Sequence, residues 1–344
     1  MEIRIRMSKI TIIDIAEALG ITPSTVSRAL AGNPYVREST RKAVQDKATE
    51  LGYERNIIAS NLRSGKTSTI GIVIPRINRN FFSIIISAAE SVLDDAGYSV
   101  IICQSHEKEE DEIRALKTLT GSRVGGILIS HSLSTKTGKG IMESVGRDIK
   151  LVQFDRVFPD MPGSTITNDD SNGAYNATMH LIKKGYTRIG TFSGYQGTGI
   201  YIDRYEGYKR ALEHAGIPLD ESIVFPGFID REAGYSNAAK ALERGCDALY
   251  CTGDYSALGA MIFLKEKGIA VPEEFGIVGT ANEDFTSLIS PSLTSTEQNP
   301  REIGEKAALA IIRLMRGETA GENIVVDTKL IPRESSDRKG SLHK

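Results

Sequence analysis

Residues 22–30 place short hydroxyl side chains and one arginine on a segment with helical spacing. Thr22 suits the N-cap of a helix and Pro23 its first position, where no amide donor is lost. Val26 and Leu30 define an apolar face. The opposite, outer face carries Ser24, Thr25, Ser27 and Arg28. Small hydroxyls beside a forked guanidinium are the chemistry that reads base edges in the major groove of DNA.

A second helix is predicted immediately before this segment. Thr11 and Asp14 have the spacing of a capping box, in which the Thr11 hydroxyl accepts a hydrogen bond from the Asp14 amide. Apolar residues then recur at helical spacing up to Leu19, and Gly20 suits a left-handed stop. Two short helices joined by a glycine-containing turn form a helix-turn-helix unit. The spacing alone fits an ordinary helical hairpin equally well, so the residues by themselves leave both interpretations open.

Residues 14–30 resemble the DNA-binding headpiece of the lactose-repressor (LacI/GalR) family of transcriptional regulators. The likeness continues through Thr40-Arg41, Leu51-Gly52-Tyr53 and residues 56–62, and then covers most of the chain. It implies an α-helical helix-turn-helix headpiece over residues 8–55, in which a third helix runs roughly from Glu38 to Leu51.

The resemblance also assigns roles within the headpiece. The implied base-reading residues are Pro23, Ser24 and Arg28, and the implied phosphate contacts are Thr25 and Ser27. Phosphate contacts fix the register on DNA without carrying sequence information. For Arg28, a phosphate contact is the alternative to a bidentate contact with guanine.

Residues 56–67 form a polar stretch with glycine and serine that has the composition of a linker. Ile58, Ala59 and Leu62 nevertheless fall on one helical face. In the family this stretch is a hinge helix that forms on DNA, and the resemblance implies that Leu62 wedges into the minor groove, where it would bend the duplex. A free linker is the alternative.

Charge is unevenly distributed along the 344 residues. Residues 1–66 hold 11 basic and 7 acidic side chains, a net charge of +4, whereas the remainder holds 31 basic and 37 acidic side chains, a net charge of −6. A basic head on an acidic body favours a nucleic-acid-binding module attached to a different domain. The three scattered cysteines are read as small buried hydrophobes, and no apolar run is long enough to span a membrane, so we expect a cytoplasmic protein without a membrane partner.

From Ile70 onward, apolar strands alternate with amphipathic helices, which indicates parallel α/β sheets covered on both faces. The length of this region exceeds one doubly wound sheet and favours two lobes with a cleft between them. The resemblance implies an effector-binding and dimerisation domain over residues 68–336, similar to periplasmic sugar-binding proteins, whose chain crosses between the lobes near Asn168, Ser290 and Val326.

Ligands of α/β lobes bind outside the carboxyl ends of the strands, so the loops there hold the candidate ligand residues. By the resemblance these are Phe81, Phe82, Asp155, Arg156, Arg204, Asp254 and Asn282. An aromatic ring can stack on a sugar face, and a carboxylate beside a guanidinium suits hydroxyl groups. The alternatives are a core role for one phenylalanine, a structural ion pair for Asp155 with Arg156, and helix capping for Asp254.

The sequence departs from the family pattern at three places in these loops. Arg79-Asn80 stands where the family has Asn-Pro, and Gly253 replaces an asparagine. Ala281 occupies the position of a common hydroxyl-accepting aspartate, for which Asn282, Glu283 or Gln298 are possible substitutes.

Enzymatic chemistry is not predicted. The five histidines are scattered, without metal-ligand spacing, and are interpreted as surface or loop residues. The glycine-rich run at residues 193–199 lacks the dinucleotide fingerprint, so no cofactor is expected.

We therefore expect a homodimeric transcription regulator, most simply a repressor, that binds operator DNA. A small effector in the cleft, a sugar or sugar derivative, would control its affinity. The alternatives are a two-lobed solute-binding protein and a cytosolic sugar- or nucleotide-processing enzyme. The sequence leaves open whether the effector induces or co-represses, and whether the assembly is a dimer or a tetramer.

Overall fold

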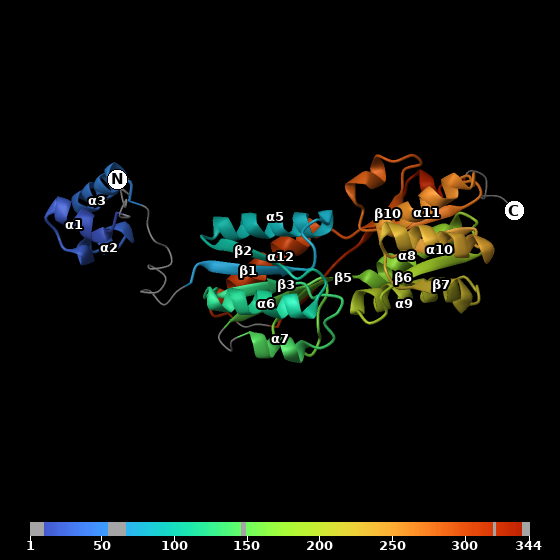
Figure 1. Ribbon diagram of the computed structural model, residues 1–344, viewed down its shortest axis with the longest axis horizontal. Coiled ribbons are helices and arrows are strands. Elements are labelled where there is room, and N and C mark those ends of the chain that lie inside the picture. The colour runs from blue at the N-terminus through green and yellow to red at the C-terminus, as the bar shows by residue number, and fades with distance from the viewer. Residues whose placement is uncertain (1–9, 54–66, 146–148, 319–320, 339–344) are drawn as a thin grey trace, which may run out of the picture. The chain divides into compact units, whose positions relative to one another are not determined.

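A computed structural model of the chain describes residues 10–53, 67–145, 149–318 and 321–338. It divides into two compact units, residues 1–66 and 67–344, which are described separately below (Figure 1). The predicted hinge over residues 56–67, with its wedge residue Leu62, lies outside the described residues apart from Thr67.

The described residues of the first unit, 10–53, form the helices α1 (Ile12–Leu19), α2 (Pro23–Leu30) and α3 (Glu38–Glu50). The capping box of Thr11 and Asp14 is present, Gly20 ends α1 with a left-handed φ of 63°, and Thr22 caps α2. These local predictions are confirmed. A small core holds the three helices together through Ile15, Ala16, Val26, Ala29, Val44 and Ala48.

The second unit consists of two α/β lobes, each built on a six-stranded sheet. The sheet of the first lobe has the strand order β11-β5-β4-β3-β1-β2, and all of its pairings are parallel. Its strands are β1 (Thr69–Ile74), β2 (Ser99–Gln104), β3 (Gly126–Ile129), β4 (Lys150–Phe154), β5 (Ser164–Asn168) and β11 (Asn323–Val326). Its helices are α5 (Asn80–Asp95) and α12 (Pro300–Met315) on one face, and α6 (Glu109–Gly121) and α7 (Gly138–Ser144) on the other.

The sheet of the second lobe has the order β12-β10-β9-β8-β6-β7, in which only the pairing of β12 with β10 is antiparallel among the described strands. Its strands are β6 (Ile189–Gly194), β7 (Val224–Pro226), β8 (Ala248–Cys251), β9 (Gly276–Thr280), β10 (Thr294–Glu297) and β12 (Lys329–Ile331). Its helices are α8 (Asp170–Lys183) and α9 (Gly199–His214) on one face, and α10 (Arg231–Glu243) and α11 (Asp254–Glu266) on the other.

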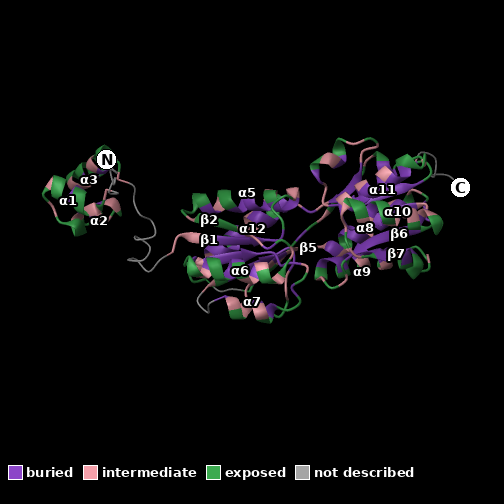
Figure 2. Cartoon of the chain, viewed as in Figure 1, coloured by how far each residue is buried: buried purple, intermediate pink, exposed green. Residues whose placement is uncertain are grey.

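The strands lie between helical layers, and their side chains are largely buried (Figure 2). This is the reason that the central strands read as continuous apolar runs in the sequence. Three short 3₁₀ helices, Glu221–Ile223, Asp284–Ser287 and Glu334–Ser336, complete the second lobe. Within the described residues, no helix is both long and apolar enough for a membrane span.

The chain passes between the lobes three times. The first crossing follows β5 at Asn168, and the third follows β11 at Val326, both as predicted. The second prediction, near Ser290, is wrong, because β10 at Thr294–Glu297 still belongs to the second sheet. The chain leaves that lobe only at Gln298 and Asn299, before α12 joins the first lobe.

Candidate functional site

Helix α2 presents a polar face that its apolar side chains hold in place. Val26 and Ala29 are buried against the neighbouring helices, and therefore the rest of the helix faces outward. Pro23, Ser24 and Arg28 are exposed, whereas Thr25 and Ser27 are half-buried. The Thr22 hydroxyl lies 2.9 Å from those of both Ser24 and Thr25, which orders the first turn. The three predicted base-reading residues are thus the most accessible, although their contacts with DNA remain a prediction.

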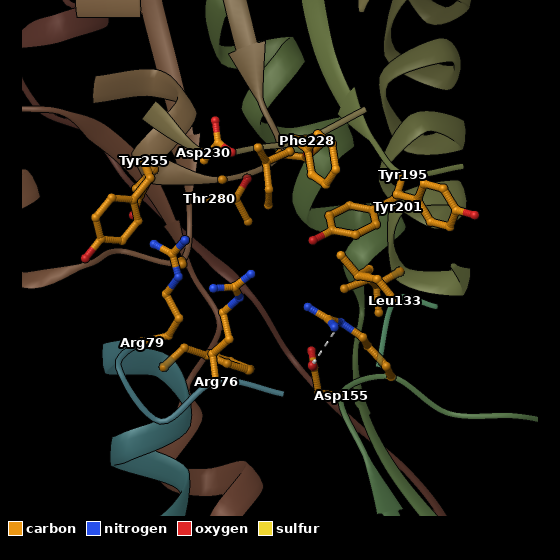
Figure 3. A pocket seen from close by; sticks show the side chains of 18 of the residues that line it. Arg76, Arg79, Leu133, Asp155, Tyr195, Tyr201, Phe228, Asp230, Tyr255 and Thr280 are labelled. Atoms are coloured by element: carbon orange, nitrogen blue, oxygen red, sulfur yellow. Dashed lines mark ion pairs between the residues drawn. The ribbon is translucent and has the colours of Figure 1, made fainter. Parts of the chain in front are cut away.

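A cavity of about 610 Å³ lies between the two lobes of the second unit (Figure 3). Its walls come from the loops that follow β1, β2, β3 and β4 in the first lobe and β6, β7, β8 and β9 in the second. These are the carboxyl ends of the strands, where parallel sheets place their ligand sites. The volume is within the ordinary range for small-molecule sites.

Six of the seven predicted ligand residues line this cavity. They are Phe81, Phe82, Asp155, Arg156, Arg204 and Asp254. Both phenylalanines also belong to the core of the first lobe, and their rings meet edge to face at 5.2 Å. The sequence allowed a core role for one of the two phenylalanines. Both belong to the core, and both also line the cavity.

Asn282 is the exception, and its placement in the cavity wall is corrected by the structure. Its side-chain oxygen accepts from Arg333 at 2.7 Å, and its amide donates to Glu297 at 2.8 Å, so its polar atoms are turned away from the cavity. The cause is a left-handed turn, with φ of 114° at Ala281 and 50° at Asn282. The other two proposed substitutes, Glu283 and Gln298, do line the cavity.

Asp155 and Arg156 form one polar end of the site. Ser130 donates to Oδ2 of Asp155 at 3.0 Å, while the nearest guanidinium atom of Arg156, its Nε, is 3.9 Å from that oxygen. Nη1 of Arg156 donates to Glu107 at 2.7 Å, but its buried Nε has no hydrogen-bond partner among the described residues. Burial raises the pKa of Asp155, against the opposing charge of Arg156. An unmatched guanidinium donor beside a carboxylate suits a ligand hydroxyl, which can accept from one and donate to the other.

A buried histidine network supports this end of the site, and it shows that His131, although in a loop, is not a surface residue. His131 is fully buried, and its Nδ1 lies 2.7 Å from Glu112 while its Nε2 lies 3.1 Å from Gln153. Burial would raise the pKa of Glu112, but its contacts with His131 and Ser132 outweigh burial and lower that pKa. The backbone oxygen of His131 in turn accepts from Arg156, so the network positions the arginine.

Arg204 belongs to the second lobe's wall and is only 4% exposed. Its Nε donates to Asp170 at 2.7 Å, and its Nη1 donates to the Thr252 carbonyl at 2.8 Å. Burial raises the pKa of Asp170 to about 6, although the charge of Arg204 opposes this. The arginine therefore has a structural partner already, in addition to its place beside the cavity.

Asp254 and Glu283 form a pair of acidic groups that also belong to the second lobe's wall. Asp254 accepts from Ser295 Oγ at 2.7 Å and from the Glu283 amide at 2.8 Å. It makes no cap hydrogen bond to α11, so it holds the loop after β9 rather than the helix end. Burial, and then the charge of Asp254, raise the pKa of Glu283 to about 7, and burial raises that of Asp254 to about 6.

Several lining residues were not identified from the sequence. Arg76 and Arg79 come from the loop between β1 and α5, and Glu107 from the loop after β2. Tyr195, Tyr201, Phe228 and Tyr255 add aromatic surface from the second lobe (Figure 3). The strand-end rule could have found the two arginines, because they follow the apolar run of residues 70–74 within five residues.

Comparison with known proteins places both units. Residues 11–56 match the family model described as bacterial regulatory proteins, lacI family, and residues 178–336 match a periplasmic binding protein-like domain. The chain is 30% identical over 330 residues to the HTH-type transcriptional repressor PurR of Actinobacillus pleuropneumoniae, covering 94% of this chain and 98% of that protein.

Solved structures agree with this comparison. The transcriptional regulator CelR in complex with cellobiose is 27% identical, with a TM-score of 0.72 over 95% of this chain and 99% of that chain. The lac repressor dimer bound to operator and an anti-inducer has a TM-score of 0.86 over 96% of this chain and 99% of that chain. At 23% identity the latter supports the fold alone.

Proposed function

The chain belongs to the LacI family of bacterial regulatory proteins, a family of ligand-controlled DNA-binding transcriptional regulators, and from this premise we propose which residues do each part of its work. In this proposal it acts as a cytoplasmic repressor whose headpiece, residues 8–55, reads an operator. Residues 56–67 serve as the hinge, and residues 68–336 bind an effector and dimerise.

The outward polar face of α2 carries the DNA-reading part of the proposal. Pro23, Ser24 and Arg28 contact bases, and Thr25 and Ser27 contact phosphates. The exposed positions of Pro23, Ser24 and Arg28, compared with half-buried Thr25 and Ser27, support this assignment. Side chains that contact bases must reach furthest from the helix. Leu62 enters the minor groove.

The cavity between the lobes binds the effector, a sugar or sugar derivative. Aromatic surfaces from both lobes and hydrogen-bonding groups at Asp155 and Arg156 support a polyhydroxylated ligand. The cellobiose complex of the similar regulator CelR agrees with this class. Phe81, Phe82, Arg204 and Asp254 complete the proposed wall.

Homodimer formation is supported by the edge of the first lobe. Strand β2 ends the sheet and exposes Ile101 and Ile102, which are 36% and 42% accessible. An exposed apolar sheet edge is a surface that proteins cover with another chain. A two-fold dimer matches a pseudopalindromic operator.

Operator binding tests the function directly. The preferred DNA sequence is selected from a random pool with the full chain, and affinities for it and for random DNA are measured at one salt concentration. Arg28→Ala should cost about 1–3 kcal/mol on the selected sequence and relax the preference at one base pair. Lys42→Ala, an exposed basic residue on α3, is the matched control.

An equal loss for Arg28→Ala on selected and random DNA would reduce Arg28 to a phosphate contact. Failure of the pool to enrich any sequence would remove the proposed function as a whole.

A further inference from the structure

Three of the carboxylates that line the cavity accept hydrogen bonds from the protein's own donors. Glu107 accepts from Arg156 and from the Leu133 amide at 2.7 and 2.9 Å. Asp230 accepts from the Ala233 amide at 2.8 Å as the cap of α10. Asp254 accepts from Ser295 and from the Glu283 amide. The charges of Glu107, Asp230 and Asp254 are therefore compensated within the protein.

Two of the four arginines around the cavity contrast with this pattern. Arg156 and Arg204 each make a 2.7 Å ion pair. Arg76 comes no closer than 3.8 Å to a carboxylate oxygen, that of Glu107. Arg79 has no carboxylate oxygen within 4.0 Å in the described part of the chain, and no hydrogen bond from either the Arg76 or the Arg79 guanidinium is found there.

The side chains of Arg76 and Arg79 both line the cavity. In Figure 3 both extend from the loop before α5 toward the second lobe. The Arg79 guanidinium lies 4.1 Å from the ring centre of Tyr255, which belongs to that lobe, so the stacking orients it. Arg79 is also the N-cap residue of α5 and makes no side-chain cap, so the positive end of the helix dipole adds to the same region.

The carboxyl group of Glu283 interacts electrostatically with Arg79, but it only partly offsets the positive charge of the two arginines. Its pKa is raised to about 7, first by burial and then by the charge of Asp254, so near neutral pH much of it is protonated. A protonated carboxyl donates a hydrogen bond and favours an anionic neighbour.

We propose that the effector carries an anionic group, a carboxylate or a phosphate, and that Arg76 and Arg79 bind it while the sugar hydroxyls lie toward Asp155 and Arg156. This rests on the proposed function of the cavity and specifies its ligand. Two guanidiniums without close carboxylate partners offer the forked donors that such anions bind. Closing the lobes over them without an anion would remove water from positive charge and leave it uncompensated.

Matched sugars separate the possibilities. Binding of glucose, glucuronate, gluconate and glucose 6-phosphate to the full chain is measured by calorimetry and thermal shift, together with the corresponding galactose series. At least one anionic compound should bind more tightly than its neutral counterpart. The carboxylate and phosphate members show which anion is preferred, and inorganic phosphate tests the anion alone.

The variants Arg76→Gln and Arg79→Gln should weaken binding of the anionic compound roughly tenfold or more, because a charge-assisted hydrogen bond is lost. They should leave the affinity for the neutral counterpart nearly unchanged. Arg313→Gln on α12, whose side chain pairs with Glu322 at the surface, controls for the loss of a positive charge.

Each outcome has a defined meaning. A neutral sugar that binds at least as tightly as its anionic partner, or unchanged anion affinity in both arginine variants, overturns the inference and leaves the sugar-responsive function in place. Absence of binding by every sugar overturns the proposed effector class and the inference with it, while operator selection still tests DNA recognition separately.

Discussion

Single residues of the cavity serve both the fold and the site. Arg204 is the clearest case, because its guanidinium spans the buried carboxylate of Asp170 and the end of β8 at Thr252. Breaking a buried ion pair leaves its partner charge uncompensated, which commonly costs more than the pair itself contributes. A ligand role for Arg204 therefore cannot be tested by its removal alone.

We predict that Arg204→Ala destabilises the folded protein by about 3–5 kcal/mol, because Asp170 loses its counter-ion. Asp170→Asn added to Arg204→Ala should recover a large part of this loss, since no buried charge remains. Urea unfolding of the two single variants and the double variant gives the coupling energy. Additive losses would show that the pair contributes little to stability.

The raised pKa of Glu283 predicts how the free energy of unfolding depends on pH. Its pKa is raised from 4.5 to about 7 by burial and by Asp254, with Asp284 acting in the same direction and Arg79 against it. A carboxyl with a raised pKa stabilises the fold fully below its unfolded pKa, and this contribution is lost as pH rises through 7.

Glu283→Gln mimics the protonated form, so it should melt like the parent at about pH 4 and about a few degrees higher at pH 8. Differential scanning calorimetry across this range measures the effect. If the melting temperatures of the two proteins change with pH in the same way between pH 4 and pH 8, the pKa of Glu283 is not raised in the folded protein.

At the scale of elements, close helix contacts define both lobes. Gly304 of α12 lies against the backbone of α5, where an added Cβ would come within 2.4 Å of the Ile85 oxygen. Gly207 of α9 lies against the Ser171 carbonyl of α8, and Gly259 of α11 against the backbone of α10. The first of these contacts fixes α5, whose first turn carries Phe81 and Phe82.

We predict that Gly304→Ala destabilises the chain by about 1–3 kcal/mol through overpacking against α5. Gly121→Ala is the control, because an added Cβ at the end of α6 meets no atom within 4 Å. It should be neutral or slightly stabilising, as alanine restricts the unfolded chain. Equal denaturation midpoints for the two variants would contradict the packing argument.

Elements also show what the sequence could predict. The apolar runs of β1, β3 and β8 are buried on both faces and were recognised, as were the caps of α1 and α2. Strand β5, with sequence STITN, and β10, with TSTE, are short and polar, so the apolar pattern of the sequence does not indicate them. Their burial comes from neighbouring strands and the crossings, which local periodicity does not report.

The site follows the same rule. Asp155 and Arg156 were predicted from the family resemblance, and their position directly after a strand agrees with the rule for ligand sites in parallel sheets. Asn282 was misplaced because a left-handed turn and its contact with Arg333, distant in sequence, decide its direction. Local spacing contains neither the turn nor the partner.

For the whole molecule, the position of the cavity between the two lobes predicts that ligand binding and lobe arrangement are linked. Three chain crossings join the lobes, and Asn80 donates to Asp284 across them at 3.1 Å. A ligand that contacts both walls favours one arrangement, and it shifts the population only by its difference in affinity for the two.

This linkage makes a final prediction that holds for induction and for co-repression alike. If the effector changes operator affinity by some factor, operator DNA must change effector affinity by the same factor. Operator binding is measured by fluorescence anisotropy with and without saturating effector, and effector binding by calorimetry with and without operator. The two ratios should agree within error.

Asn80→Ala removes a contact between the lobes that lies outside the proposed effector contacts, so it should alter both ratios equally while Arg28→Ala alters neither. Two ratios that differ beyond error would show that effector and DNA act on separate equilibria, and the single switch between lobe arrangements would have to be abandoned.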